Sequence, residues 1–519
     1  MWLSRRDLLR TAGLALGVAG ATSVLGACGA STPGAAPVEN AGTRTPKQGG
    51  RLRTVFTGGG AAESLDPFTG QAPIDFARND VIFDSLFTLD GGKPVPRLAV
   101  SAEAAADAKS FTLKVRDGVK WHDGSPFTAE DVAHTFRYLG APERPFPSEL
   151  AMYVNLAGIE VVDPTTLRVP TLQPLGDPAL VLAAFAVKAI KNGTQSFTQQ
   201  TAIGTGPYRV EAFEAGREAT LTRFDGHWDK AGYVDELVLL SLTDPQAKTN
   251  AVLTGQADYA ADIPFTTAKT GAASADLEVR TAGERNRVGF GFVLNTTIAP
   301  FNDPRVRRAF RLALDRKALV DSVFLGYGTV GNDLFGYGTT DFSSREPLAR
   351  DLDEARKLVQ AANAGGTPIV IRSAEYEIGF NASTQLVAEQ LKEIGLTVKP
   401  DIVGVAEFYD PSAISAANAM TFSVGALPLP VLYARLASNP AFALVDNDLS
   451  AAMATGLGSL DAAARGKAWT QLQDVMSDRG NTVVWGLADT LSLARKEVAG
   501  IEVRGGMAKY PYLGHAGLA

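Results

Sequence analysis

Residues 113–132 read LKVRDGVKWHDGSPFTAEDV, and this run changes from the pattern of a strand to the pattern of a helix. Apolar side chains alternate with polar ones from Phe111 to Val115, which predicts a strand with one buried face. Asp117 and Gly118 follow, and this pair is typical of a tight turn. The first part of the run therefore predicts a half-buried strand that ends at a turn.

The end of the same run has the pattern of a helix N-terminus. Thr128 is followed three positions later by Asp131, so each side chain can bond a backbone N–H that the first turn leaves free. Two later stretches show comparable starts, because Asp303 precedes Pro304 and Asp351 stands before an apolar periodic segment. Strand and helix patterns alternate in this way along the chain, which predicts an α/β fold.

The size and composition of the chain limit the class of protein to which it can belong. It has 519 residues, more than one compact core holds, so two or three domains are expected. It is 45% hydrophobic and 20% charged, which is typical of a folded protein. The 56 acidic and 49 basic residues give a formal net charge of −7, and no basic block is present. Nucleic-acid binding therefore has no electrostatic support.

Residues 1–27 have the three parts of a secretory signal peptide. Arg5 and Arg6 precede an apolar stretch from Thr11 to Leu25, which is too short to span a bilayer. The segment from Ser4 to Leu9 resembles a twin-arginine export motif, which directs folded proteins across the membrane. A general secretory signal that happens to contain two arginines is the alternative.

Cys28 is the only cysteine in the chain, so no intrachain disulfide can form. It ends the sequence Leu-Gly-Ala-Cys, which resembles a bacterial lipobox and implies a lipidated Cys28 at the mature N-terminus. Two or more acyl chains anchor a protein stably to a bilayer. Residues 28–47 are rich in small residues and proline and predict a flexible tether. We therefore expect an extracytoplasmic protein held at the outer face of the cell membrane, on the periplasmic side.

Sequence motifs for common catalytic and metal chemistry are absent. The chain contains no glycine-lysine phosphate loop, no HExxH, no G-x-S-x-G and no CxxC. The four histidines are dispersed and predict ordinary surface or core positions: His122, His134, His227 and His515. We expect no enzyme activity, no cofactor and no bound metal, although a surface-anchored hydrolase stays an alternative.

Several segments together resemble bacterial solute-binding protein family 5, which includes oligopeptide-, dipeptide- and nickel-binding proteins of ABC importers. The most specific segment is residues 113–132. The other matching segments are 49–53, 65–67, 94–99, 204–208, 300–309, 313–316 and 390–396. The resemblance extends over nearly the whole mature chain. Within it, the arginines from Arg305 to Arg308 are interpreted as a solvated helix face.

This resemblance implies a periplasmic-binding-protein-like type II fold, with two lobes, hinge strands and an inserted third domain. The lobes of such proteins close over a ligand and deliver it to the membrane subunits of an importer, most simply from a monomer. Carried onto this chain, domain I comprises 48–92, 203–295 and 481–519, domain II comprises 93–202, and domain III comprises 296–480.

The resemblance also nominates residues for the ligand cleft. Glu63 and Ser64 precede a loop that usually faces the ligand. Asn286 and Arg287 lead into a strand that crosses between the lobes, and Trp485 near the last crossing could supply a flat apolar wall. Further candidates come from the stretch 420–430, which is comparable to the peptide-binding segment of the family: Phe422, Gly425 and Leu427.

The stretch 420–430 departs from the peptide-binding pattern because it contains no acidic residue. In peptide-binding relatives an aspartate there pairs with the α-ammonium of the ligand, and a buried charge without its partner costs about 3–5 kcal/mol. Either Glu63 or another acid replaces it, or the ligand is not a free-amine peptide. Peptide transport with ABC permease and ATPase partners is the leading hypothesis. Sugars, opines, amino-acid derivatives and metal complexes are alternative ligands, and a ligand-sensing receptor is an alternative role.

Overall fold

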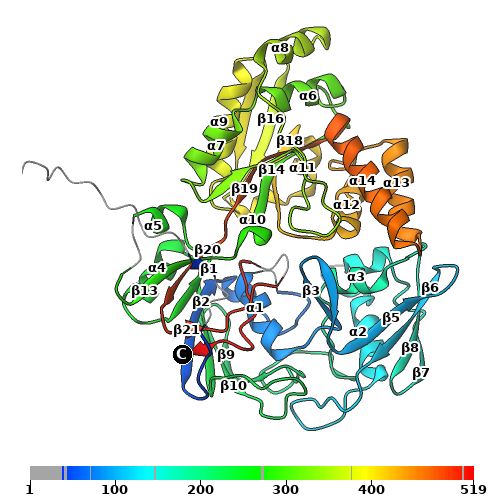
Figure 1. Cartoon of the computed structure of the whole chain (residues 1–519), viewed down its shortest axis with the longest axis vertical. Helices are drawn as coiled ribbons and strands as arrows, with labels where there is room; N and C mark the ends of the chain where they lie inside the picture. The colour runs from blue at the N-terminus through cyan, green and yellow to red at the C-terminus, as the bar shows by residue number, and fades with distance from the viewer. Residues whose placement is uncertain are drawn as a thin grey trace, which may run out of the picture. The chain divides into compact units, whose positions relative to one another are not determined.

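Three larger β-sheets with surrounding helices form the part of the chain that the structure describes (Figure 1). The structure is a computed structural model, and it describes residues 38–39, 44–70, 72–144, 148–270, 274–375, 377–504 and 508–519. The expected signal peptide and Cys28 lie outside these residues. Within the described ranges, no helix is both long enough and apolar enough to cross a membrane.

The first sheet has eight strands in the order β1-β13-β20-β12-β2-β11-β10-β9. Its strand β2 (Arg51–Thr57) pairs in parallel with β11 (Glu236–Leu242), whose nearly continuous apolar sequence suits a strand covered on both faces. The sheet also includes β1 (Val38–Glu39), β9 (Tyr208–Glu214), β10 (Glu218–Arg223), β12 (Tyr259–Ala261), β13 (Leu277–Thr281) and β20 (Leu491–Arg495). The helices of this region are η1 (Gly60–Ala62), α1 (Pro73–Ile82), α4 (Pro245–Leu253), α5 (Phe265–Lys269) and η3 (Glu284–Asn286).

The second sheet has four antiparallel strands in the order β5-β6-β8-β7, and residues 113–132 begin within it. The predicted strand is confirmed as β6 (Ser110–Val115), which buries alternate residues from Phe111 onward. The predicted helix is confirmed as α2 (Ala129–Leu139), where the backbone N–H of Thr128 donates to Asp131 at 2.7 Å. Neighbouring elements are β3 (Phe87–Asp90), β4 (Lys93–Pro96), β5 (Ala99–Ala104), η2 (Glu149–Met152), β7 (Glu160–Asp163), β8 (Thr166–Pro170) and α3 (Pro178–Ala184).

The third sheet has six strands in the order β15-β19-β14-β18-β16-β17. These strands are β14 (Val288–Leu294), β15 (Gly328–Val330), β16 (Pro368–Ser373), β17 (Thr397–Ile402), β18 (Ala419–Val424) and β19 (Thr482–Ala488). The accompanying helices are α6 (Pro304–Ala313), α7 (Arg316–Val323), α8 (Leu352–Ala361), α9 (Phe380–Lys392), α10 (Val405–Phe408), α11 (Pro411–Ala416), α12 (Leu429–Ser438), α13 (Asn447–Gly458) and α14 (Ala462–Arg479). A short pair, β21 (Val498–Ala499) and β22 (Gly517–Leu518), lies near the end of the chain.

The two other predicted helix starts in this region are confirmed. Asp303 accepts a hydrogen bond from the N–H of Arg305 at 2.8 Å, and Asp351 accepts one from the N–H of Glu354 at 2.9 Å. Each carboxylate satisfies a backbone donor that the first helical turn leaves unpaired, which explains why α6 and α8 begin directly after these residues.

The prediction that the arginines of α6 form a solvated face is wrong for one of them. Arg305 and Arg308 are exposed, but Arg307 is only 5% exposed. Its guanidinium donates to the carbonyl of Arg479 at 2.6 Å and to that of Phe301 at 2.7 Å. Arg307 is buried because the last turn of α14 presents carbonyl oxygens that have no partner within the helix.

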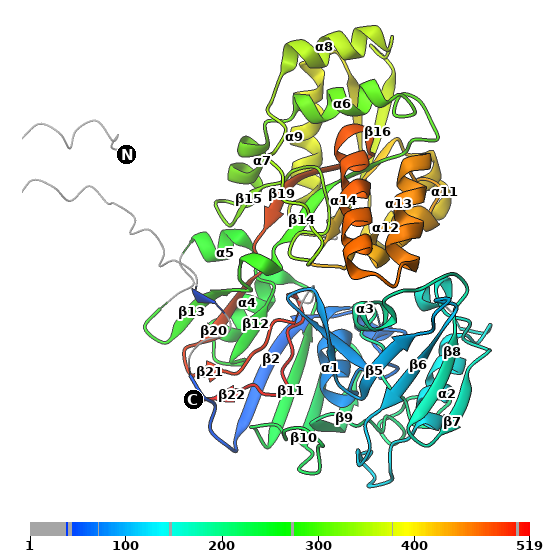
Figure 2. The ribbon, with the colours of Figure 1, turned by 45° about the vertical axis from the view of Figure 1, so that its right-hand side comes forward.

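The chain passes between the first and third sheets at two places, which Figure 2 shows near β14, β19 and β20. Residues 282–287 lead from β13 to β14, and residues 489–490 lead from β19 back to β20. The strands β14 and β19 are antiparallel neighbours, so the two connections lie together. The expected ranges assign both strands to domain I, whereas both hydrogen-bond within the third sheet. The domain limits otherwise stay a prediction.

Part of the expected tether is attached to the folded body. Val38 and Glu39 form β1, which pairs in parallel with β13. Further along, the N–H of Lys47 donates to the carbonyl of Leu518 at 2.8 Å, and Pro46 is buried. These contacts join the start of the described body to its C-terminal end.

Candidate ligand site where the chain passes between its sheets

A small pocket lies at the two connections between the first and third sheets. Its walls include Asp262 after β12, Phe290 of β14, Glu377 after β16, Asp489 of the return connection, and Lys509 near the C-terminus. The cavity measures about 20 Å³, which is room for about one water molecule. Its lining comes from both sheets, so its size depends on how the two sheets approach each other.

An ion pair crosses this pocket. Glu377 follows a strand of the third sheet and pairs directly with the ammonium of Lys509. The Nζ atom of Lys509 also lies 3.6 Å from Oδ2 of Asp262, which follows a strand of the first sheet. The ammonium therefore interacts with one carboxylate from each side of the pocket.

Glu377 is held in place by a second contact. The hydroxyl of Ser423 in β18 donates to its carboxylate at 3.1 Å, and only 6% of Glu377 is exposed. Burial raises the pKa of Glu377 above its usual range, while the charge of Lys509 acts in the opposite direction. The pocket thus contains a fixed, desolvated carboxyl group.

Asp262 has an uncommon backbone conformation. Its φ angle is +50°, in the left-handed region that non-glycine residues rarely adopt. The buried ammonium of Lys248 donates to the carbonyls of Asp262 at 2.8 Å and Ala261 at 2.9 Å, and to the hydroxyl of Thr57 at 2.8 Å. These bonds hold the bend that brings the Asp262 carboxylate to the pocket. Strained positions of this kind are concentrated at functional sites.

Two of the predicted residues lie at the first connection. Arg287 donates to Asp489 at 2.7 Å and to Glu284 at 2.9 Å, so it ties the outgoing connection to the returning one. Burial alone would lower the pKa of Arg287, but the bond and charge of Asp489 raise it, and the guanidinium stays charged. Asn286 donates to the carbonyl of Ala282 at 2.7 Å and braces the same turn.

Glu63 and Ser64 belong to a separate buried network. Glu63 accepts a hydrogen bond from Ser241 at 2.5 Å and lies 3.6 Å from the guanidinium of Arg78. Arg78 also pairs with Asp75 and donates to the carbonyl of Ser64 at 2.7 Å. The side chains of Glu63 and Arg78 are at most 1% exposed. The charge of Glu63 is therefore matched within the protein.

The predicted residues Phe422, Gly425 and Leu427 flank Ser423 in β18 and the loop that follows it. The ring of Phe422 is partly buried against Phe335, with centroids 5.3 Å apart. The N–H of Leu427 donates to the carbonyl of Gly425 at 2.7 Å, which makes a tight turn. The stretch without acids is thus adjacent to Glu377, an acid supplied by a different segment.

Trp485 is fully buried within β19. Its indole stacks on Phe324, with centroids 4.7 Å apart, and meets Phe290 edge-on at 6.2 Å. Both neighbours belong to the same apolar cluster. In this structure Trp485 supports the strand that leads to the return connection, and its contact with a ligand stays a prediction.

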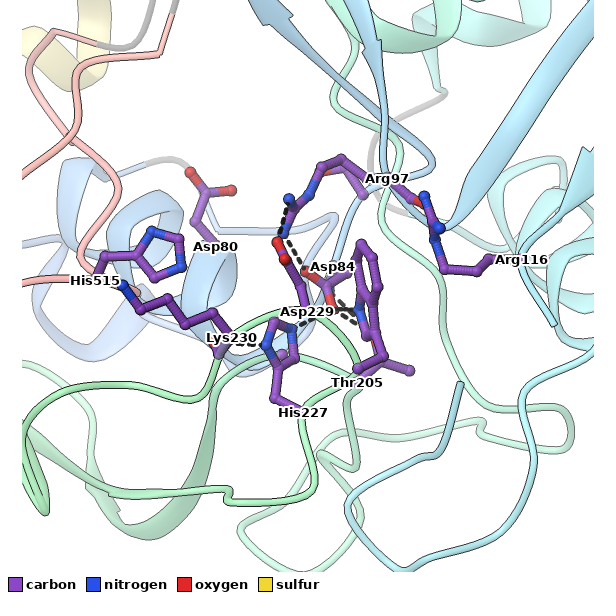
Figure 3. Close-up of polar contacts among 12 residues, drawn as sticks. Asp80, Asp84, Arg97, Arg116, Thr205, His227, Asp229, Lys230 and His515 are labelled. Atoms are coloured by element: carbon purple, nitrogen blue, oxygen red, sulfur yellow. Dashed lines mark hydrogen bonds and ion pairs between the residues drawn. The ribbon is translucent and has the colours of Figure 1, made fainter. Parts of the chain in front are cut away.

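A second polar cluster surrounds Asp84, and Figure 3 shows Arg97, Thr205 and His227 converging on it. Asp84 accepts hydrogen bonds from Trp228 at 2.8 Å and from Thr205 and His227 at 3.2 Å, and Arg97 lies 3.6 Å away. Burial would raise the pKa of Asp84, but His227, Arg97 and Trp228 outweigh it and hold the pKa at about 2. The residues that line the adjoining pocket come from the segments 80–97 and 183–188 and include Arg504. None of them belongs to the third sheet. We interpret this cluster as structural.

No pattern in the sequence indicates Glu377, Lys509 or Asp262 as site residues. Glu377 and Lys509 stand 132 positions apart, and no motif surrounds either residue. Across the described ranges, no group of three or more His, Cys, Asp and Glu side chains is arranged to hold a metal ion. The pocket is therefore defined by paired charges.

The second and third sheets also approach each other through helices and loops. Arg435 of α12 pairs with Glu149 at 2.6 Å, and Arg465 of α14 pairs with Asp177 at 3.2 Å. A single buried apolar cluster contains Leu182 of α3 and Trp469 of α14. The structure therefore has these two regions packed together.

This architecture defines the class of periplasmic-binding-protein-like folds of type II, in which α/β lobes are joined by crossing strands and ligands lie between the lobes. The family model described as bacterial extracellular solute-binding proteins, family 5 Middle, matches residues 93–426. The chain belongs to this family, which consists of binding proteins and not enzymes. The family resemblance and the fold class expected from the sequence are both confirmed.

The individual relatives have low sequence identity to this chain. The glutathione-binding protein GsiB of Salmonella paratyphi A is 27% identical over 65% of this chain, and the match spans 66% of that protein, just under two thirds. The periplasmic binding protein DppA from Helicobacter pylori, solved with the peptide STSA, has a TM-score of 0.77 and 18% identity, covering 91% of this chain and 98% of its own. AgaA from Agrobacterium tumefaciens R10, solved with agropinic acid, has a TM-score of 0.76 and 20% identity, covering 91% and 99%. The likeness to these structures shows the fold alone.

Proposed function

We propose that this protein is the extracytoplasmic binding component of an ABC importer and that it captures a small polar solute, most simply a peptide. The observation that carries the proposal is the pocket at the two connections, whose charged lining comes from both sheets. A ligand that contacts both sides favours the closed arrangement, because only there are all its contacts made. The importer then receives the solute chemically unchanged.

The choice of peptide rests on family membership and on the charges at the site. Named relatives include proteins solved with a peptide and with agropinic acid, and a glutathione-binding protein. The pocket offers carboxylates and an ammonium, so it suits a solute that carries charged groups of its own. Opines, amino-acid derivatives, sugars and metal complexes are the competing ligand classes.

The protein is also proposed to be anchored to the membrane by a lipid on Cys28, after export and cleavage of residues 1–27. The support is the sequence alone: paired arginines, an apolar stretch and Leu-Gly-Ala-Cys. A binding protein held near the membrane by a lipid stays close to the permease that it serves. Its delivery to permease and ATPase subunits is part of the same proposal.

Ligand screening by thermal unfolding tests the transport function. The protein from residue 38 onward, which keeps β1, is mixed separately with di- to tetrapeptides, glutathione, agropinic acid, oligosaccharides and nickel-histidine complexes. A ligand present at 100 times its Kd stabilises the folded state by about 2.7 kcal/mol and raises the unfolding temperature. We expect a shift with peptides that shows saturable one-to-one binding and no turnover. Absence of a shift with every class would remove the support for solute capture.

A further inference from the structure

Glu377 is the fixed member of the ion pair at the connections. Its carboxylate is held by the hydroxyl of Ser423, and its side chain is 8% exposed. A buried carboxylate needs a cation or hydrogen-bond donors close to it. Glu377 stands three residues before α9 and lines the pocket, so its nearly buried carboxylate depends on partners within the protein.

Lys509 is the member of the pair that can leave. Its side chain is 21% exposed, and it carries its ammonium on a long flexible stem from a turn near the C-terminus. Lys509 is therefore the more exposed and more flexible member of the pair. The pair therefore combines an acid that is fixed with a cation that is exchangeable.

Asp262 adds a second carboxylate to the same cation. Its oxygen lies 3.6 Å from the Lys509 ammonium, and its strained backbone is held by the bonds of Lys248. The Lys248 ammonium donates its hydrogen bonds to two carbonyls and a hydroxyl, and it interacts with the Asp262 carboxylate only through its charge. Two acids from opposite sheets converge on the Lys509 ammonium.

We infer that the space between Glu377 and Asp262 is a subsite for the primary ammonium group of the transported solute, and that Lys509 fills it as a tethered stand-in that the solute displaces. This inference rests on the proposed function and deepens it, because it assigns the solute to the class of amines. A solute ammonium takes over the same contacts, while the released Lys509 is solvated. The exchange conserves the charge of the pocket.

Chemical rescue of a Lys509 variant tests the subsite without knowledge of the natural solute. Lys509→Ala removes the ammonium and leaves space beside Glu377, and we expect a lower unfolding temperature. Addition of n-butylammonium chloride is expected to raise that temperature by at least about 2 °C, with sodium chloride at equal ionic strength and n-butanol as the comparison solutes. The double variant Lys509→Ala, Glu377→Gln should show no such rise.

A matched control separates this site from general effects of the amine. Lys317→Ala removes a lysine whose ion pair with Asp321 is on the surface, with 77% and 56% of the two side chains exposed. We expect n-butylammonium to leave the unfolding temperature of that variant unchanged. Equal effects on the Lys509 and Lys317 variants, or no effect on the Lys509 variant, would overturn the inference.

Binding of peptides to the unaltered protein gives a second, independent measurement. The tetrapeptide Ser-Thr-Ser-Ala and its N-acetylated form differ in the ammonium group, and we expect acetylation to weaken binding at least about tenfold. Glu377→Gln should remove most of that difference. Binding that is insensitive to acetylation would overturn the subsite but not the transport function. If no peptide binds, the peptide proposal fails and the rescue experiment decides the subsite.

Discussion

His122 illustrates how one partly buried side chain sets a pH response. Its Nδ1 atom accepts a hydrogen bond from the N–H of Gly204 at 3.2 Å, and its Nε2 atom lies 2.9 Å from the carbonyl of Gly206, to which it donates. The first bond needs an unprotonated Nδ1, so the ring is neutral. Burial lowers the pKa of His122 to about 4 from its ordinary 6.5.

The lowered pKa of His122 predicts a loss of stability in acid. The folded state holds this histidine neutral, so its contribution is fully present above about pH 6.5 and is lost as the pH falls towards about 4. The lowered pKa corresponds to about 3 kcal/mol of stability that protonation of His122 removes. His122→Gln keeps a donor for Gly206 but does not titrate. Urea unfolding across this pH range should therefore give a shallower decline for the variant than for the unaltered protein.

His134→Gln is the matched control for that measurement. His134 bonds the carbonyl of Thr194 at 2.9 Å. The His134→Gln variant removes this histidine and retains His122. The control should retain the steep decline between pH 6.5 and 4. If His122→Gln declines as steeply as the control, the acid sensitivity has another source.

Among elements, α6 and α14 are joined by arginines that bond helix-end carbonyls. Arg311 donates to the carbonyl of Ser477 at 2.7 Å and to those of Met476 and Asp478 at 3.3 and 3.2 Å. The positive charge also complements the negative end of the α14 dipole. Burial lowers the pKa of Arg311 from its ordinary value.

Removal of this cap should destabilise the third sheet and its helices. Arg311→Met keeps most of the apolar stem but leaves buried carbonyls without donors, and we expect a loss of about 3 kcal/mol in the free energy of unfolding. Arg308→Met changes an exposed arginine on the same helix and should cost less than about 0.5 kcal/mol. Guanidinium unfolding measures both. Equal losses of stability would show that α6 tolerates no arginine substitution, whether or not the arginine contacts α14.

Local elements could be predicted from the sequence, and the site could not. The helix starts at Thr128, Asp303 and Asp351 were predictable because a cap needs only residues two or three positions apart. Glu377 and Lys509 meet because β16 and the C-terminal segment are brought together by the folded sheets. That juxtaposition is a long-range property, and local patterns carry no signal for it. Arg307 was misread for the same reason, because its partner is the end of a distant helix.

For the whole molecule, the proposed lipid anchor predicts that the protein is found in the membrane fraction. Cys28→Ser removes the thiol that would accept the lipid, so the protein should move from the membrane fraction to the soluble extracytoplasmic fraction. Fractionation followed by immunoblotting measures this. Continued tight membrane association of Cys28→Ser would contradict the anchor.

The position of β20 has a consequence for how the chain is made. Residues 491–495 fit between β12 and β13, and Arg280 bonds the carbonyl of Arg495 across 215 positions of sequence. A ribosome makes this strand about 200 residues after its two neighbours, so the first sheet stays incomplete until then. Contacts of such long range form slowly. Any quality check that admits only folded molecules to export would therefore depend on whether translation had passed residue 495.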